Sequence, residues 1–144
     1  MTIEQLSVFV ENKSGKLVQV LKTLGGAGID LRAMSIADTA DFGILRLIVS
    51  EPDRARDILR DAGYVVILNS VLPLAVDDTP GSLAGVLEAL SEAEIGVEYV
   101  YAFVAHGKSR AHVILRTTDD ETAASVLSRR GVSFMSAGEI LRTQ

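Results

Sequence analysis

Two stretches of this sequence decide the fold: residues 10–34 read VENKSGKLVQVLKTLGGAGIDLRAM, and residues 76–100 read VDDTPGSLAGVLEALSEAEIGVEYV. At an offset of 66 residues, the same residue type recurs at the first glycine, along one helix stripe and at the start of the next strand: Gly15 and Gly81, Leu17 and Leu83, Leu24 and Leu90, Ile29 and Ile95. Two unrelated amphipathic helices would share periodicity but not these glycines and flanking strands. The chain is therefore interpreted as an internal repeat.

The repeat extends beyond these two stretches. The same offset carries residues 47–49 (LIV) onto residues 113–115 (VIL), and it reaches 68 where Ile58 faces Val126. This drift predicts a two-residue length difference near the second helix of the unit. Two domains follow, residues 1–69 and 70–144, joined near Asn69 and Ser70.

Each half predicts the same order of elements. Apolar runs rich in β-branched residues predict strands, and apolar residues at i, i+3, i+4 and i+7 predict helices. In the first half, strands are expected at 3–10, 29–37, 43–49 and 64–68, with helices over 17–24 and from Pro52 to Ala62. In the second half, strands are expected at 71–76, 95–104, 109–116 and 132–135, with helices over 80–93 and after the capping-box spacing Thr118-x-x-Glu121.

The order βαββαβ, present twice, sets the fold class. It predicts an α+β protein with two ferredoxin-like units, each an antiparallel four-stranded sheet with two helices on one face, packed side by side. A doubly wound parallel sheet is excluded, because the middle of each unit is strand, turn and strand without a helix. Since helices cover only one face of each sheet, we expect a homodimer that covers the other.

Composition narrows the classes of function. The chain has 144 residues, 48% of them hydrophobic, no cysteine, a formal charge of −5 and a pI near 5.0. These values exclude a disordered chain, thiol chemistry and Cys-type metal sites, and they argue against nucleic acid or an anionic membrane as partner. The N-terminal residues lack the pattern of a signal peptide and no apolar run reaches membrane length, so a cytoplasmic protein is expected.

The loop between the first strand and the first helix is the candidate site in both halves. It reads Asn12-Lys13-Ser14-Gly15 in the first and Asp78-Thr79-Pro80-Gly81 in the second. Unpaired N–H groups and the positive end of the helix dipole favour a carboxylate at such a position. A neighbouring Asn or Asp side chain can accept a ligand ammonium group, which together suits a free α-amino acid. Alternatively, Asn12 and Asp78 are only helix caps and the glycines only shape the turn.

A βαββαβ unit of about 70 residues with N-x-S-G-x-L or D-x-P-G-x-L after its first strand resembles an ACT domain. The resemblance covers the chain as a tandem pair over residues 3–69 and 70–137, with the second loop the closer match and the first lacking the proline. It implies a regulatory module that binds an amino acid where two such domains meet. The implied ligand contacts are the two loops and the start of the second strand of a neighbouring unit: Asn12, Lys13, Ser14, Gly15, Lys16, Leu17, Asp78, Thr79, Pro80, Gly81, Ser82, Leu83, Asp30, Leu31, Gly96 and Val97.

Other residues that could carry chemistry have simpler explanations. His106 and His112 lack supporting carboxylates between them, so they are interpreted as solvated histidines and not as metal ligands. The alternating aromatic residues of 99–103 (YVYAF) are interpreted as packing residues, because an RNA-binding surface would also need basic residues. We therefore expect no catalytic residue, no metal and no cofactor.

The sequence as a whole favours a non-catalytic regulatory protein that binds a free amino acid and signals in trans to a partner, such as an enzyme of amino-acid metabolism. Two alternatives stay open: a purely structural oligomerisation module, and a small enzyme that processes an amino acid.

Overall fold

The computed structural model describes residues 2–38, 41–104 and 110–142 of the chain. They form two compact units, one of residues 4–69 and the other of residues 1–3 together with 70–144. Each unit has the order βαββαβ, and its strands are antiparallel. The predicted fold class of two ferredoxin-like units is confirmed, whereas the side-by-side packing of the two sheets stays a prediction.

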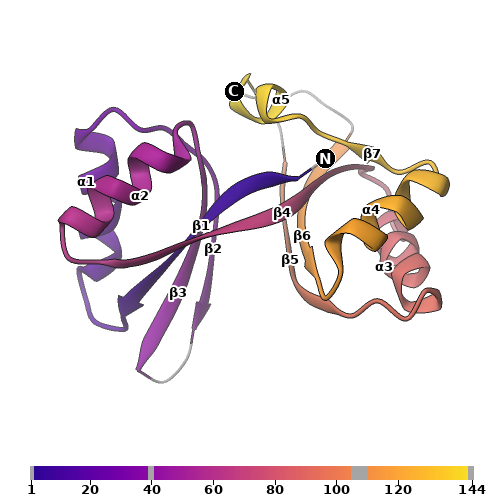
Figure 1. The fold of residues 1–144 in the computed structure, drawn as a ribbon, viewed down its shortest axis with the longest axis horizontal. Helices are drawn as coiled ribbons and strands as arrows, with labels where there is room; N and C mark the ends of the chain where they lie inside the picture. The colour runs from indigo at the N-terminus through magenta and orange to yellow at the C-terminus, as the bar shows by residue number, and fades with distance from the viewer. Residues whose placement is uncertain (1, 39–40, 105–109, 143–144) are drawn as a thin grey trace. The chain divides into compact units, whose positions relative to one another are not determined.

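The first unit places two helices on one face of its sheet (Figure 1). Its strand order is β4-β1-β3-β2, so that β2 is an edge strand. The elements of this unit are β1 (Ile3–Glu11), α1 (Lys16–Gly26), β2 (Leu31–Asp38), β3 (Phe42–Val49), α2 (Pro52–Asp61) and β4 (Val65–Asp77).

The second unit repeats this arrangement with the order β7-β4-β6-β5. Its own elements, after the second part of β4, are α3 (Ser82–Glu92), β5 (Val97–Val104), β6 (Arg110–Thr117), α4 (Asp120–Arg129), β7 (Ser133–Phe134) and α5 (Ala137–Arg142). The last strand has two residues, and the pattern in the sequence gave no signal for α5.

Each unit has its own apolar core between helices and sheet. In the first unit the core includes Leu6, Val8 and Val10 of β1 with Val20 and Leu24 of the predicted helix stripe. In the second unit the equivalent stripe packs in the same way, and its members include Val86, Ala89 and Leu90. The apolar periodicity therefore identifies correctly which face of each helix is buried.

The join between the halves is one continuous strand, where the sequence predicts two strands with a break at Asn69–Ser70. β4 has 13 residues and runs through both positions. The two polar residues are held within their own units: Ser7 Oγ donates to Asn69 Oδ1 at 2.7 Å, and Arg116 Nη1 donates to the Ser70 carbonyl at 2.9 Å. Polar side chains at a strand position thus did not mark a loop here.

The sequence alignment predicts the length difference between the units near the second helix, but the structure places it in the hairpin turn. β2 and β5 keep the offset of 66, whereas β3 and β6 already differ by 68, as do α2 and α4. Three residues separate β2 from β3 and five separate β5 from β6. Leu47 therefore corresponds to Leu115, not to Val113. Because Val113 and Leu115 are both apolar strand residues, the sequence alone matches Leu47 with either of them.

The predicted capping box at the start of α4 is also wrong. Asp119 is the N-cap residue, and its carboxylate accepts from the Thr122 amide at 3.1 Å and from the Thr122 hydroxyl at 2.6 Å. Thr118 is engaged elsewhere, because its Oγ1 accepts from the Gly96 amide at 3.1 Å and its own amide donates to the Gly96 carbonyl at 2.9 Å. Thr118 thus pairs with Gly96 just before β5, and for this reason it does not cap α4 as the capping-box spacing predicts.

Candidate functional site

The two candidate loops have the same backbone geometry despite their different sequences. Gly15 has φ 86° and ψ −13°, and Gly81 has φ 88° and ψ −9°. In each loop the amide of the residue after the glycine donates to the carbonyl three residues earlier at 3.2 Å, from Lys16 to Lys13 and from Ser82 to Thr79. This bond and the positive φ at the third position are those of a type II turn, which requires glycine there and favours proline one residue before. Both halves therefore use the glycine to turn the chain into the helix.

In both loops the glycine itself occupies the N-cap position. The N-cap residues of α1 and α3 are Gly15 and Gly81, so Asn12 and Asp78 lie three residues before the cap. The alternative that Asn12 and Asp78 serve as helix caps is therefore wrong. In each loop the first helical amide already donates to the turn carbonyl, and the helix dipole places partial positive charge at the amides that follow it.

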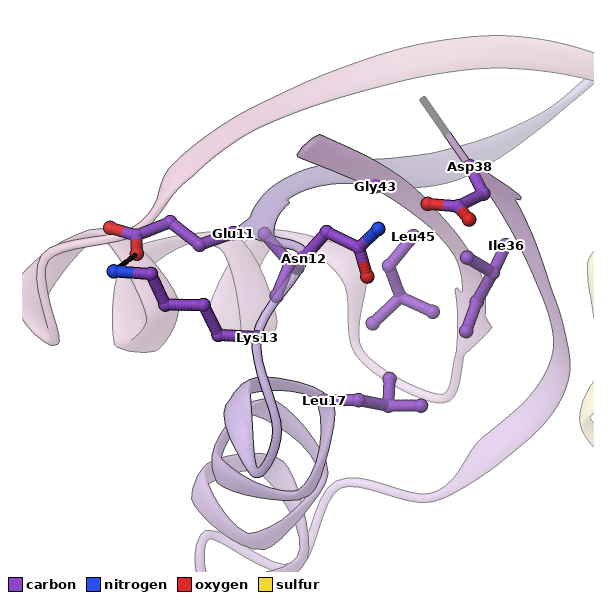
Figure 2. Close-up of a pocket in the computed structure, with 9 residues that line it drawn as sticks. Glu11, Asn12, Lys13, Leu17, Ile36, Asp38, Gly43 and Leu45 are labelled. Atoms are coloured by element: carbon purple, nitrogen blue, oxygen red, sulfur yellow. Dashed lines mark ion pairs between the residues drawn. The ribbon is translucent and has the colours of Figure 1, made fainter. Parts of the chain in front are cut away.

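In the first unit, the loop borders a cavity of about 240 Å³ (Figure 2). Its lining comes from β1 and the loop, from the first turn of α1, and from the ends of β2 and β3: Val10, Glu11, Asn12, Lys13, Leu17, Ile36, Asp38, Gly43 and Leu45. The strand register explains this grouping, since Gly43 of β3 pairs with Val10 on one side and with Asp38 on the other. The cavity lies entirely within the first unit.

Polar and apolar groups occupy different parts of this cavity. Figure 2 shows Leu17, Ile36 and Leu45 around its apolar part, with the amide of Asn12 extending into it. Glu11 and Lys13 form an ion pair at 3.2 Å on the outer side of the loop, where both side chains are exposed. Their pairing leaves the apolar part without an intruding charge from the loop.

The structure brings together only some of the residues that the sequence pointed to. Asn12, Lys13 and Leu17 line the cavity, whereas six further lining residues were missed: Val10, Glu11, Ile36, Asp38, Gly43 and Leu45. Only the strand register could have found the last four, since they come from a hairpin whose ends are far from the loop in sequence. Ser14, Gly15 and Lys16 complete the turn that begins at Lys13, and they are not among the residues that line the cavity.

The predicted contacts at the start of the second strand are used within their own units. The Asp30 amide donates to Ser50 Oγ at 3.0 Å, and the Gly96 amide donates to Thr118 Oγ1 at 3.1 Å. In the first unit, Leu31 pairs with Val49 and so lies at the opposite end of β2 from Asp38. A contribution of Asp30, Leu31, Gly96 or Val97 to a site in a neighbouring unit stays a prediction.

The second loop has different surroundings. Ser82 lines a cavity of about 230 Å³ that lies between β4, α3 and β7, together with Asp77, Arg110, Val132 and Ser133 among others. Arg110 Nε lies 3.7 Å from Asp77 Oδ1 at its rim. The hydroxyl groups of Thr79 and Ser82 form a hydrogen bond of 2.6 Å across the turn. Asp78, Thr79, Pro80, Gly81 and Leu83 thus share the turn of the first loop but not its cavity.

Other candidate chemistry receives no support from the described residues. His112 is buried and packs edge-on against Phe103 with ring centroids 5.2 Å apart, so the interpretation of a solvated histidine is wrong for this residue. His106 lies outside the described residues. Within the described ranges no group of three or more His, Asp or Glu residues could hold a metal ion, and no helix is long and apolar enough to cross a membrane.

Comparison with known proteins agrees with the fold of the two units. The chain aligns over 99% of its length with protein BT0572 from Bacteroides thetaiotaomicron, covering 97% of that chain at 38% identity and a TM-score of 0.91. The regulatory subunits of aspartate kinase from Thermus thermophilus and Thermus flavus share the fold, with TM-scores of 0.64 and 0.63, at 16% and 17% identity. This chain covers 91% and 88% of those two chains, with 88% and 87% of its own length. No curated protein gives a significant match. The ACT domain pair matches residues 1–143, and the chain belongs to this family.

Proposed function

We propose that this protein is a non-catalytic regulatory protein that binds a free α-amino acid at the interface of two ACT domains, with contacts from the loop Asn12–Gly15, and signals its occupancy in trans to an enzyme of amino-acid metabolism. Membership of the ACT domain pair family supports a regulatory role. The proposal includes a cytoplasmic homodimer, with residues 1–69 and 70–144 as its two ACT domains, and it includes the loop Asp78–Gly81 as a second, unequal position.

One observation carries the proposal: the start of α1, which has glycine as its N-cap residue, lies beside a cavity into which an amide side chain extends. The N–H groups that follow Lys16 at the beginning of α1 suit a carboxylate, because the helix dipole places positive charge there. The Asn12 side chain offers a carbonyl oxygen that accepts from an ammonium group. A free α-amino acid carries these two groups on one carbon atom.

A thermal-shift screen of the twenty amino acids tests the proposal. A ligand that binds only the folded state adds about 2.7 kcal/mol of stability at 100 times its dissociation constant. At roughly 2–4 °C for each kcal/mol in a chain of this size, the melting temperature should rise by about 5–10 °C.

Two variants make the screen specific to the loop. Asn12→Ala should reduce the shift, whereas Gln19→Ala, an exposed position on the following helix, should leave it unchanged. If no amino acid at millimolar concentration moves the melting temperature, the protein is a structural module. Turnover of a bound amino acid would instead identify an enzyme.

A further inference from the structure

The cavity of the first unit has an apolar interior that its own fold leaves partly open. Val10 and Leu45 form its floor on β1 and β3, and Leu17 approaches from α1. Ile36 on the edge strand β2 is 48% exposed although it pairs with the buried Leu45. An exposed large apolar side chain at the wall of a cavity gains from any apolar group that covers it.

We propose that this cavity takes the side chain of an apolar aliphatic amino acid of the leucine, isoleucine and methionine class, and that Asp38 receives the ligand's ammonium group. The proposal rests on the proposed function and adds the class of ligand and the unit that binds it. Each methylene group buried against Leu17, Ile36 and Leu45 should tighten binding by about fourfold. A charged side chain would lose its hydration against these three residues, which offer it no hydrogen-bond or ion-pair partner.

Asp38 is placed to recognise the ammonium group. It lines the cavity from the end of β2, and Figure 2 shows its side chain near Ile36, across the cavity from Lys13. Among the described residues it has no ion-pair partner, whereas Glu11, the other acid that lines the cavity, is already paired with Lys13. Because an ammonium group has three N–H donors, Asp38 and the Asn12 side-chain carbonyl can each accept one of them while the carboxylate faces the first turn of α1.

The second unit differs at the positions that matter. At the offset of 66 that β2 and β5 keep, Ala102 stands for Ile36 and Val104 for Asp38. The second unit thus carries neither the large apolar residue nor the carboxylate at these strand positions. We expect the apolar ligand to be bound tightly by the first unit alone, so that the loop Asp78–Gly81 is the much weaker of the two positions.

Isothermal titration calorimetry of the full chain tests these statements with L-leucine, L-isoleucine, L-methionine, glycine, L-lysine and L-glutamate. The three apolar ligands should bind at least tenfold more tightly than the other three, with one site per chain. Binding of glycine, lysine or glutamate as tight as that of leucine would overturn this inference and leave the proposed function standing. If none of the six binds, and no other amino acid does, both are wrong.

Two variants locate the ligand in the cavity. Ile36→Lys should weaken leucine binding at least tenfold, whereas the matched Met34→Lys, two residues earlier on the same strand and 42% exposed, should not. Equal effects of the two variants would contradict the assignment. Because both positions are exposed, both variants should fold, and melting curves without ligand check this.

The role of Asp38 has its own readout. Asp38→Asn should weaken leucine at least tenfold but leave unchanged the binding of 4-methylpentanoate, which is leucine without its ammonium group. Asp61→Asn, an exposed position on α2, makes the same charge change away from the cavity. If Asp38→Asn weakens both ligands equally, or weakens neither, Asp38 does not receive the ammonium group.

Discussion

Replacing Gly15 by alanine should destabilise the protein through the backbone alone. The φ of Gly15 is 86°, and a Cβ atom added there would meet no heavy atom within 4 Å. Steric overlap with a neighbour therefore contributes nothing, and the cost is that of a left-handed conformation for an L-residue, roughly 1–2 kcal/mol. Alanine also restricts the unfolded chain, which returns about 0.4–1 kcal/mol. The net loss should be about 1 kcal/mol.

The chain supplies a matched control on the same helix. Gly25 lies inside α1, is exposed, and also has open space around an added Cβ, but its φ is not positive. Gly25→Ala should stabilise by about 0.5–1 kcal/mol, because alanine is the better helix former. Gly81→Ala and Gly85→Ala form the equivalent pair on α3, with the same opposite signs expected.

Urea denaturation followed by circular dichroism measures these differences, and Gly15→Asn separates their cause. Asparagine adopts positive φ more readily than alanine, so Gly15→Asn should cost less than Gly15→Ala. If Gly15→Ala is neutral or stabilising, or if Asn is no better than Ala, the turn does not depend on the left-handed conformation. The argument that glycine is required in both loops would then be refuted.

Three further outcomes are expected. The pKa of Asp119 is lowered by the hydroxyl and amide of Thr122, which donate to its carboxylate. The contribution of Asp119 to stability is therefore present above the ordinary Asp pKa and lost as the pH falls through the lowered value. Asp119→Asn keeps the cap, so the fall of the urea midpoint over this pH range should become smaller. A Cβ at Gly96 would lie 3.1 Å from Cγ2 of Thr118, so Gly96→Ala should destabilise, and less so when combined with Thr118→Ser, as a double-mutant cycle of unfolding would show. β4 exposes the apolar side chains of Val65 and Ile67 at 63% and 45%, and a homodimer would cover them. Light scattering at tens of micromolar should therefore report a mass of about 31 kDa, twice the 15.4 kDa chain, and lysine at both positions should lower this mass. A monomeric wild-type protein would rule out the homodimer.

The features that the sequence predicted correctly are those that a local pattern encodes. The helix stripe that includes Val20 and Leu24 needs only the 3.6-residue period, and the glycine of each turn needs only a positive φ that other residues avoid. Both signals are present twice, at the same offset, so the second copy tests the first. The order of elements and the fold class follow from such signals alone.

The features that the sequence did not predict depend on pairing between distant segments. Whether β4 breaks at Asn69 depends on the partner that Ser7 supplies, 62 residues earlier. Whether Thr118 caps a helix depends on the competing Gly96 amide. The walls of the cavity depend on the register that sets Gly43 beside Val10. None of these partners lies within the window in which a motif can be recognised.

The repeat also explains why the sequence predicted the loop of the candidate site but not the strand residues that line its cavity. The backbone of the two loops is the same to within a few degrees at Gly15 and Gly81, since that geometry starts a helix in each unit and any loss of it costs stability. The side chains around the loops are under no such requirement, so Asp38 in one unit can correspond to Val104 in the other without harm to the fold. Comparing the two halves therefore finds the positions that build the unit. The residues of the proposed site are instead positions where the halves differ, both on β2, at Ile36 and Asp38, and in the loop, at Asn12. On this proposal the specificity for a ligand is to be sought on β2 as well as in the loop.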